Sequence, residues 1–368
     1  MEHYDLLIVG AGLSGAVIAE HAVRAGKRVL VIDKRDHIAG NVYDEIDSET
    51  GIRVSRYGAH LFHTNDTGVW DYVNSFGKFQ RWDHRVVADV SGVCVPVPVN
   101  INTVNALYGT NIENETQMAD WLSAERISGP ILNSEDVALT RVGPRLYKTL
   151  FKDYTVKQWA KVPSELEPSV LERIPVRTNF DDRYFGDKYQ GLPANGYTAL
   201  VAAMLKGATV RLGVDWSDMV SEGCTYTWTT LVFTGPIDVY FKDSGLPPLE
   251  YRSINFEWTR LPIDGFYQPN SVVNYPSADV PYTRCVEYKH FLNQRSPWTI
   301  LAKETTCATG EPYYPVPTAA NRELYLKYVE LASRSPVHFV GRLASYKYFN
   351  MDQAIRNAID YFKAHLSG

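Results

Sequence analysis

The chain has 368 residues, of which 45% are hydrophobic and 21% are charged. This composition predicts a globular protein with a large core, folded as one multi-part domain or a few smaller ones. The formal net charge of −5 gives no electrostatic reason to expect a nucleic-acid partner. The apolar stretch Leu6–Val9 is far too short to span a bilayer and no basic secretory start precedes it, so we expect no membrane partner and a cytoplasmic location.

Neither cysteine nor histidine forms a metal-binding pattern in the sequence. The 4 cysteines, Cys94, Cys224, Cys285 and Cys307, are widely spaced and include no C-x-x-C pair. We therefore expect reduced thiols and no metal. The chain is rich in aromatic residues, with 24 Tyr, 14 Phe and 8 Trp. Tyrosines recur in short motifs between the expected elements, where their rings suit stacking on sugars or bases.

The N-terminal segment reads as a dinucleotide-binding unit of strand, glycine turn, helix and strand. An apolar run leads into Gly10-Ala-Gly-Leu-Ser-Gly15, a helical stretch follows, and a second apolar run ends at Asp33. Gly10 allows the tight turn, Gly12 lets backbone N–H groups approach a pyrophosphate, and Gly15 lets the helix pack close to the strand. The Asp33 carboxylate can accept hydrogen bonds from a ribose. The expected cofactor contacts of this unit are Gly10, Gly12, Leu13, Ser14, Gly15 and Asp33.

The next part of the chain predicts an inserted helical domain. A helix is expected from near Asp66 to about Phe76, and Val86–Val95 reads as a hairpin that turns at Ser91-Gly92. From Asn102 to about Leu150 the apolar residues follow a helical period. The expected N-caps of these helices are Thr103, Thr116 and Ser134.

The second half predicts a sheet domain and then a return to the cofactor domain. Residues 173–211 read as strand and loop with a helix at Thr198–Lys206, and residues 228–302 alternate apolar and polar positions as antiparallel strands do. The chain closes with a helix over about Ala319–Ser333, a strand at Val337–Val340 and a helix from about Met351 to His365. A late strand that returns beside the first one is typical of flavin-binding folds.

The turn Gly341-Arg342 after that late strand is a second candidate cofactor contact. An arginine at this place can hold the pyrophosphate and the flavin edge of a dinucleotide. An ordinary surface turn is the alternative. The N-terminal unit favours the cofactor, because a large dinucleotide needs a second contact.

Together these elements predict an α/β protein with a Rossmann-like FAD-binding domain, an inserted helical domain and a mixed or antiparallel sheet domain. The FAD-binding domain is expected to be discontinuous, over residues 1–80, about 190–230 and 335–368. The helical domain covers about 100–172, and the sheet domain about 81–99, 173–189 and 231–318. The polar loop from Arg177 to Tyr189, which contains Gly186, is the expected mobile lid of a substrate site.

Short polar and aromatic motifs recur from residue 58 to residue 344. They are Gly58-Ala-His-Leu-Phe-His-Thr64, Asp153-Tyr-Thr-Val-Lys-Gln-Trp159, Ile174-Pro-Val-Arg177, Tyr189-Gln-Gly-Leu-Pro193, Leu249-Glu-Tyr-Arg252, Pro281-Tyr-Thr-Arg284, Glu311-Pro-Tyr-Tyr-Pro315 and Gly341-Arg-Leu-Ala344. In order and spacing they resemble the bacterial UDP-galactopyranose mutase family, nearly end to end. The resemblance implies a flavoenzyme that interconverts UDP-galactopyranose and UDP-galactofuranose with no net redox change and supplies furanose for cell-surface glycans. It also implies FAD that works in its reduced form, with NAD(P)H as a candidate reductant, and a homodimer with contacts from the helical domain.

The isomerisation implied by the resemblance makes two demands on a site. Breaking the anomeric C–O bond releases UDP, so cations must hold the diphosphate before and after cleavage. The freed anomeric carbon then needs a nucleophile that is also an electron sink, and no side-chain pair does both. N5 of a reduced flavin can attack this carbon, and the covalent N5-sugar adduct lets the ring open and reclose through O4.

Two arginines and two histidines resemble the catalytic residues of the family. Arg177 and Arg284 match the two diphosphate clamps, one on the mobile loop and one on the sheet, and a solvated surface charge is the alternative for Arg177. His60 and His63 match histidines that orient hydroxyls or stabilise the reduced isoalloxazine. A buried structural pair is the competing interpretation, and metal binding is disfavoured because no Cys or carboxylate partner is near them in sequence.

Aromatic side chains are the main expected substrate contacts. Phe151 and Tyr154 stand three apart on a helical end and match the family's uracil pocket, although core packing is the usual role of aromatics at this spacing. The further substrate contacts implied by the resemblance are Trp159, Tyr184, Asn270, Tyr313, Tyr314 and Tyr348. The further cofactor contacts that we expect are Arg252, Arg342 and Met351.

Two departures from the family keep the substrate open. Asn350 stands where the family commonly has Asp, which removes a negative charge near the expected site, and residues 84–135 follow the family loosely. A mutase that acts on an N-acetylated or deoxy sugar nucleotide is therefore an alternative, although His60 keeps the family's usual side chain and favours galactose. From other classes, the alternatives are a flavin amine oxidase-like oxidoreductase and a sugar-nucleotide-binding module without turnover.

Overall fold

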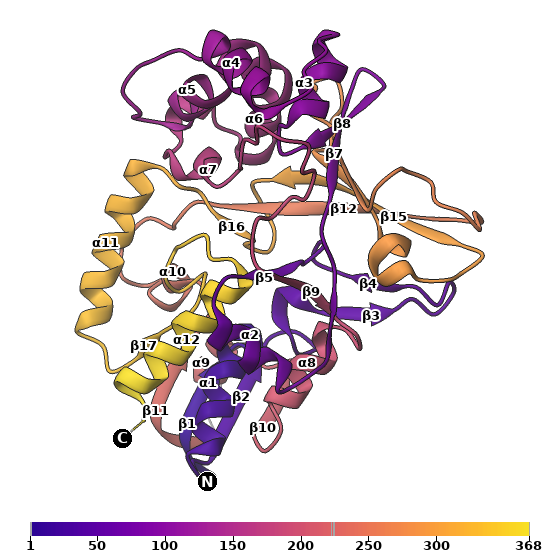
Figure 1. Cartoon of the computed structure of the whole chain (residues 1–368). Coiled ribbons are helices and arrows are strands. Elements are labelled where there is room, and N and C mark those ends of the chain that lie inside the picture. Colours follow the sequence, from indigo (N-terminus) through magenta and orange to yellow (C-terminus); the bar gives the residue numbers. More distant parts are fainter. Residues whose placement is uncertain (1, 222, 224, 368) are drawn as a thin grey trace.

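The computed structural model describes residues 2–221, 223 and 225–367. Cys224, whose thiol we expected to be reduced, lies outside this part of the chain. Figure 1 shows three lobes: a Rossmann-like lobe that holds both chain ends, a central sheet lobe and a helical lobe at the far end. This architecture confirms the predicted fold class. In the described part of the chain, no helix is long and apolar enough to cross a membrane.

The Rossmann-like lobe contains a parallel sheet of 5 strands in the order β10-β2-β1-β11-β17. Its strands are β1 (Glu2–Val9), β2 (Val29–Asp33), β10 (Thr209–Leu212), β11 (Tyr226–Phe233) and β17 (His338–Phe339). The apolar runs of β1 and β2 are buried because helices cover both faces of the sheet. Helices α1 (Leu13–Arg24), α8 (Tyr197–Met204) and α12 (Met351–His365) pack on one face, and α9 (Trp216–Ser221) and α10 (Ile237–Tyr240) on the other.

Two strand predictions for this lobe are wrong. The late strand β17 pairs with β11 and not with β1, because β11 already occupies that edge of β1. Residues 228–233, predicted as part of an antiparallel run, lie in β11, which runs parallel to β1. The apolar-polar alternation there arises in the first half of β11, where every second side chain is exposed, whereas the second half is buried.

The central lobe contains a sheet of 7 strands in the order β16-β12-β15-β14-β13-β7-β8. Its strands are β7 (Val86–Val90), β8 (Val93–Val97), β12 (Tyr251–Leu261), β13 (Val272–Asn274), β14 (Arg284–Glu287), β15 (Thr299–Cys307) and β16 (Tyr314–Pro315). Neighbouring strands are antiparallel except for the parallel pair β13 and β7. The predicted hairpin is confirmed as β7–β8, with Ser91 and Gly92 at positive φ in the turn.

The helical lobe is inserted between β8 and the strand β9 (Tyr189–Pro193). Its helices are α3 (Ile101–Tyr108), α4 (Glu115–Glu125), α5 (Ser134–Leu146), the π-helix η2 (Tyr147–Lys152), α6 (Asp153–Trp159), the short η3 (Pro163–Glu165) and α7 (Ser169–Glu172). The predicted N-caps Thr103, Thr116 and Ser134 are wrong. Asparagines just before them, Asn100, Asn114 and Asn133, accept the capping hydrogen bonds, and Asn is as good an N-cap as Ser or Thr.

Shorter elements join the lobes. Three short strands, β5 (Phe62–Thr64), β9 and β6 (Phe79–Arg81), form one small sheet, and β3 (Asp44–Ile46) pairs with β4 (Arg53–Ser55) in another. The remaining helices are η1 (Gly40–Val42), α2 (Thr67–Asn74), η4 (Tyr288–Asn293) and α11 (Ala319–Ser333). Helix α2 starts where predicted, because the Asp66 side chain accepts a hydrogen bond from the N–H of Val69.

Candidate active site

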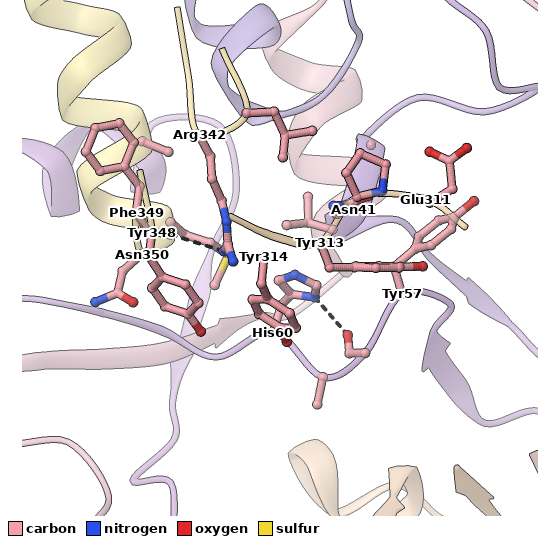
Figure 2. Close-up of a pocket in the computed structure, with 18 of the residues that line it drawn as sticks. Asn41, Tyr57, His60, Glu311, Tyr313, Tyr314, Arg342, Tyr348, Phe349 and Asn350 are labelled. Carbon is pink, nitrogen blue, oxygen red and sulfur yellow. Dashed lines mark hydrogen bonds between the residues drawn. The ribbon is translucent and has the colours of Figure 1, made fainter. Parts of the chain in front are cut away.

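A cavity of about 750 Å³ lies where the three lobes meet. The β1–α1 turn, the segment 57–63, helix α6, strand β14 and the segment 342–351 all contribute to its lining. Figure 2 shows part of it, with Arg342 and the tyrosines Tyr314 and Tyr348 close together and Tyr57, Tyr313 and Glu311 on another side. Elements that are far apart in the sequence therefore meet around one space.

One end of the cavity is built by the N-terminal glycine turn. Gly10, Gly12, Leu13, Ser14 and Asp33 line it. Gly12 is the N-cap of α1 and has no side chain to cap the helix, so the first-turn N–H groups are available to a ligand. The Asp33 carboxylate accepts hydrogen bonds from the N–H of Ala11 at 2.8 Å and of Arg35 at 3.0 Å. This end has the geometry of a dinucleotide site.

The glycines of the turn are required by close packing. Gly10 has φ of +109°, which favours glycine. A Cβ on Gly15 would lie 1.9 Å from the carbonyl oxygen of Gly10, so Gly15 sets how closely α1 approaches the turn, although it does not itself line the cavity.

The C-terminal segment adds an arginine that fits a flavin cofactor. Gly341 packs against the first turn of α1, since a Cβ there would lie 2.7 Å from Ser14 Oγ. The next residue, Arg342, donates to the carbonyl of Phe349 at 3.2 Å, but its Nε and Nη2 are buried and have no hydrogen-bond partner among the described residues. Buried N–H groups of this kind call for an acceptor, and the flavin edge of an FAD bound at the glycine turn would supply one. Met351 also lines this part of the cavity.

Arg252, an expected cofactor contact, does not line the cavity. Its side chain is buried on β12, and Nη2 donates to Thr306 Oγ1 on the neighbouring strand at 3.2 Å. The side chain therefore lies in the sheet wall, behind the lining residues.

Aromatic side chains form much of the opposite end. The predicted substrate residues that line this end are Phe151, Tyr154, Trp159, Tyr184, Tyr314 and Tyr348. Tyr313 also lines the cavity, but beside Tyr57 and Glu311. Tyr314 and Tyr348 stack with ring centroids 5.6 Å apart, and Trp159 meets both edge to face. Phe151, Trp159 and Tyr314 also belong to the helical-lobe core cluster or pack against it, so these rings serve packing and lining together.

The structure does not bring Asn270 to the cavity; Asn274 lines it instead. Asn270 precedes β13, and its carbonyl accepts a hydrogen bond from the Gln268 amide at 2.8 Å. Asn274 is the last residue of β13 and faces Arg284 in the register of the two strands. The asparagine that lines the cavity is therefore Asn274, four residues after the predicted Asn270.

Three arginines and one carboxylate set the charge at this end. Arg284 lines the cavity, and its Nε lies 2.6 Å from Oε2 of the buried Glu304. Arg173 and Arg342 each place Cζ 4.3 Å from the ring centroid of Tyr348. With one carboxylate among three guanidinium groups, this end favours a polyanion such as a diphosphate.

Arg177 was predicted as a clamp, but it is not part of the lining. Its guanidinium forms an ion pair with Asp181 and donates to the carbonyl of Arg183 at 2.7 Å. Arg173, four residues earlier, faces the cavity in its place.

Asn350 lines the cavity just before α12, where its N–H donates to Gln353 Oε1 at 2.9 Å.

Three histidines line the cavity. His60 Nδ1 donates to the carbonyl of Gly58 at 2.8 Å, so in the neutral ring Nε2 is an acceptor. Burial, with Arg342 and Arg284 nearby, lowers the pKa of His60 to about 4. His63 Nδ1 lies 2.7 Å from Asp187 Oδ2, and its ring stacks on Phe185. In the described part of the chain, no group of three or more His, Cys, Asp or Glu could hold a metal.

Several residues of the site are not predicted from the sequence: His84, Arg173, Asn274 and Glu304. His84 is buried, its Nδ1 has no partner among the described residues, and burial lowers its pKa to about 3. The signal for Glu304 is weak: an acidic residue follows the apolar run Ile300–Ala302 of a strand, where a buried carboxylate needs a partner. The other three have no sequence signal that distinguishes them from surface residues.

The fold and the cavity together define an FAD-dependent enzyme. A family model described as UDP-galactopyranose mutase matches residues 149–348, and one described as NAD(P)-binding Rossmann-like domain matches residues 8–76. The chain belongs to the UDP-galactopyranose mutase family and is an isomerase.

Two relatives have the same degree of similarity but different names. The probable UDP-galactopyranose mutase of Klebsiella pneumoniae is 38% identical, over 98% of this chain and 94% of its own. The dTDP-fucopyranose mutase of Escherichia coli is also 38% identical, over 96% of each chain. Identity alone therefore does not choose between the two sugar nucleotides.

Solved structures support the fold. A crystal structure of reduced UDP-galactopyranose mutase superposes with a TM-score of 0.79 at 18% identity and covers 99% of this chain and 95% of that one. A putative protoporphyrinogen oxidase from Exiguobacterium superposes with a TM-score of 0.68 at 16% identity, over 99% and 98% of the two chains. The architecture is thus shared by proteins named for different activities, and the site has to carry the function.

Proposed function

We propose that the chain interconverts the pyranose and furanose forms of UDP-galactose. The observation that supports this most is that a cationic, aromatic compartment opens into the same cavity as the glycine turn. Arg342 belongs to both ends. At the cofactor end, two of its buried nitrogens have no acceptor among the described residues, and at the aromatic end its Cζ lies over the Tyr348 ring. A sugar diphosphate held by Arg284 and Arg173 would share this cavity with the flavin.

The residues of this chain would bind, orient and retain the substrate. When bound and reduced, FAD supplies the nucleophile that displaces the nucleoside diphosphate from the anomeric carbon and lets the sugar ring open and reclose. Arg284 and Arg173 hold the detached diphosphate in place. Tyr314 and Tyr348 offer hydroxyl donors that carry no fixed positive charge. The neutral ring of His60 offers an acceptor nitrogen to a hydroxyl group.

Arg177 remains a diphosphate-binding residue in the proposal, provided that its loop moves. In the described conformation Asp181 and the Arg183 carbonyl occupy the Arg177 guanidinium. For Arg177 to bind a phosphate, the 177–189 loop has to move so that the diphosphate replaces these partners. The same loop carries Asp187, whose carboxylate pairs with His63, so this movement would also change the His63 contact.

A second candidate is a deoxy sugar nucleotide carrying thymine. The equally similar dTDP-fucopyranose mutase supports it. The lining of the aromatic end also supports it, because a thymine methyl group needs apolar neighbours. The aliphatic side chains in this lining include Val86, Ala88, Val97, Val99, Leu150, Leu171, Ile174 and Val272.

The test is turnover by the reduced protein. Dithionite-reduced enzyme is incubated with UDP-galactofuranose, dTDP-fucofuranose or the furanose of UDP-N-acetylgalactosamine, and the products are separated by chromatography. We expect conversion of UDP-galactofuranose to the pyranose, with no product when the flavin is oxidised. Preferential conversion of the dTDP sugar would select the second candidate. The variant Arg284→Ala should keep the yellow cofactor and lose turnover.

Two other outcomes would reject an isomerase acting on these sugars. In an amine oxidase-like enzyme, the substrate to be oxidised would reduce the flavin and so bleach its colour in the absence of dithionite. A binding module would bind UDP-sugars tightly and yield no pyranose.

We further propose that the enzyme is cytoplasmic, is reduced by NAD(P)H, and supplies furanose for cell-surface glycans. We also propose that it is a homodimer. Size-exclusion chromatography with light scattering measures the oligomer directly, and a monomer at micromolar concentration would reject this part of the proposal.

A further inference from the structure

Lys157 makes a set of contacts that the proposed reaction does not use. Its Nζ lies 2.5–3.0 Å from four backbone carbonyl oxygens, those of Tyr275, Ser277, Val280 and Tyr282. An ammonium group has three N–H donors, so one of them is shared between two carbonyls. Bonds from a charged donor are stronger than neutral ones. Burial lowers the pKa of Lys157 to about 8, so the side chain is still mostly an ammonium at neutral pH.

The loop that Lys157 holds has site residues at both of its ends. It connects Asn274, the last residue of β13, to Arg284, the first residue of β14, and these two residues face each other and line the cavity. The N–H of Tyr275 donates to the carbonyl of Thr283 at 2.8 Å, which closes the base of the loop. A displacement of the loop would therefore move the Asn274–Arg284 pair.

Lys157 itself lies on the helix that carries the aromatic wall. Tyr154 and Trp159 line the cavity from α6, one turn or less from Lys157. The backbone carbonyl of Lys157 also accepts a hydrogen bond from Thr306 Oγ1 on β15. Helix, loop and sheet are thus joined at one residue.

We infer that Lys157 is a positioning residue for the nucleoside diphosphate: its ammonium group fixes the 275–283 loop against α6 and so sets the spacing between the aromatic wall and the Asn274–Arg284 pair. The inference rests on the proposed function, and it takes the aromatic wall to bind the base and Arg284 to bind the diphosphate of the same nucleotide. Lys157 does not touch the reacting atoms. Its contribution is to substrate affinity.

Lys289 provides a matched control, because it forms the same kind of carbonyl cage away from the cavity. Its Nζ donates to the carbonyls of Ile263, Asp264, Gly265 and Ser296. Lys289 is buried and is not part of the cavity lining. Loss of this cage should cost stability without changing the site.

The test compares Lys157→Met, Lys157→Arg and Lys289→Met with the wild-type holoenzyme at pH 7. Isothermal titration gives Kd for UDP and dTDP, steady-state assays give KM and kcat, and hydrogen exchange reports on amides 275–283. In Lys157→Met we expect Kd and KM to rise at least about tenfold, which corresponds to 1.4 kcal/mol, while kcat changes little. Lys157→Arg should recover most of the affinity, and Lys289→Met should bind as the wild type does. Loop amides should exchange faster in Lys157→Met without any ligand.

Wild-type affinity in Lys157→Met would overturn the inference, and so would an equal loss in Lys289→Met. If Lys157→Met does not fold, Lys157→Gln replaces it. Failure of both to fold while Lys289→Met folds would assign Lys157 to global stability and also overturn the inference. If the wild type converts no sugar nucleotide, the proposed function fails, while nucleotide binding and loop exchange still decide the role of Lys157.

Discussion

Glu304 compensates the positive charge of Arg284 in the cavity wall. The two face each other in the register of β14 and β15, and Glu304 is 2% exposed whereas Arg284 is 27% exposed toward the cavity. A buried ion pair contributes little net stability, but removing one partner leaves a charge with no compensation. The pair therefore keeps a cation in place for a substrate anion.

Glu304→Leu should lower the free energy of unfolding by about 3 kcal/mol, because it leaves the Arg284 charge unpaired in the sheet. Urea denaturation measures this. Glu257→Leu is the control on the same sheet: it breaks the exposed Lys303–Glu257 pair and should change stability by less than about 0.5 kcal/mol. Equal losses in the two variants would show that Glu304 is not a compensating charge.

Ionisation of the Tyr348 hydroxyl group should make nucleotide binding depend on pH. Burial alone would raise its pKa, but Arg173, Arg342 and Arg284 outweigh burial and lower the pKa to about 8. Above pH 8 the phenolate neutralises guanidinium charge that the diphosphate requires. The affinity for UDP should therefore fall about tenfold at pH 9, one pH unit above the pKa.

Tyr348→Phe should remove that part of the pH dependence, as measured by titration calorimetry between pH 7 and 9. Lys157 titrates in the same range and stays in the variant, so the difference belongs to the tyrosine. The sign for stability is opposite: the pKa of Tyr348 is lower in the folded than in the unfolded chain, so its contribution to stability grows between pH 8 and 10. An unchanged pH profile in Tyr348→Phe would contradict the prediction.

At the scale of elements, the approach of helix α1 to the glycine turn decides whether a dinucleotide can bind. Gly15 and Gly10 are in contact, and a methyl group at Gly15 has no room beside the Gly10 carbonyl. The helix would have to move away from the turn, and its first N–H groups would move with it.

Gly15→Ala should therefore purify with little flavin and raise Kd for FAD by at least about tenfold. The absorbance of bound flavin per protein measures the loss. Gly129→Ala is the control, because a Cβ there meets nothing within 4 Å. Full flavin content in Gly15→Ala would show that α1 adjusts without cost.

The elements also show what sequence patterns can predict here. The dinucleotide unit lies within one continuous stretch of chain, so the turn glycines and Asp33 follow from local spacing, and the structure places Gly10 and Asp33 at the cavity. Arg173 and Arg177, like Asn270 and Asn274, are four residues apart and chemically equivalent. Which member of each pair faces the cavity depends on strand register and on the Asp181 contacts of the loop. Neither can be read from local patterns.

At the scale of the whole molecule, the cofactor part of the cavity is built from an N-terminal and a C-terminal segment of the chain. The turn after β1 and the segment 341–351 line the same space, and α12 packs on α1. A ligand bound there contacts both segments, so it should stabilise the folded state by mass action.

Saturating FAD, at a hundred times its Kd, should stabilise the protein by about 2.7 kcal/mol. Thermal denaturation of apo and holo protein measures the shift. Arg342→Ala should show a smaller shift at the same FAD concentration, because the acceptor edge of the cofactor loses its donors. Coincident melting of apo and holo protein would contradict the contact between cofactor and both chain segments.

The separation of these two segments in the chain affects when the protein can mature. The glycine turn leaves the ribosome well before β17, Arg342 and α12, and until these emerge β11 has a free edge and α1 lacks its covering helix. Domains fold as their residues emerge, so this lobe cannot close before α12 has emerged. We expect flavin to load only after β17, Arg342 and α12 are in place, so loading depends on the free flavin pool around the chain at that stage.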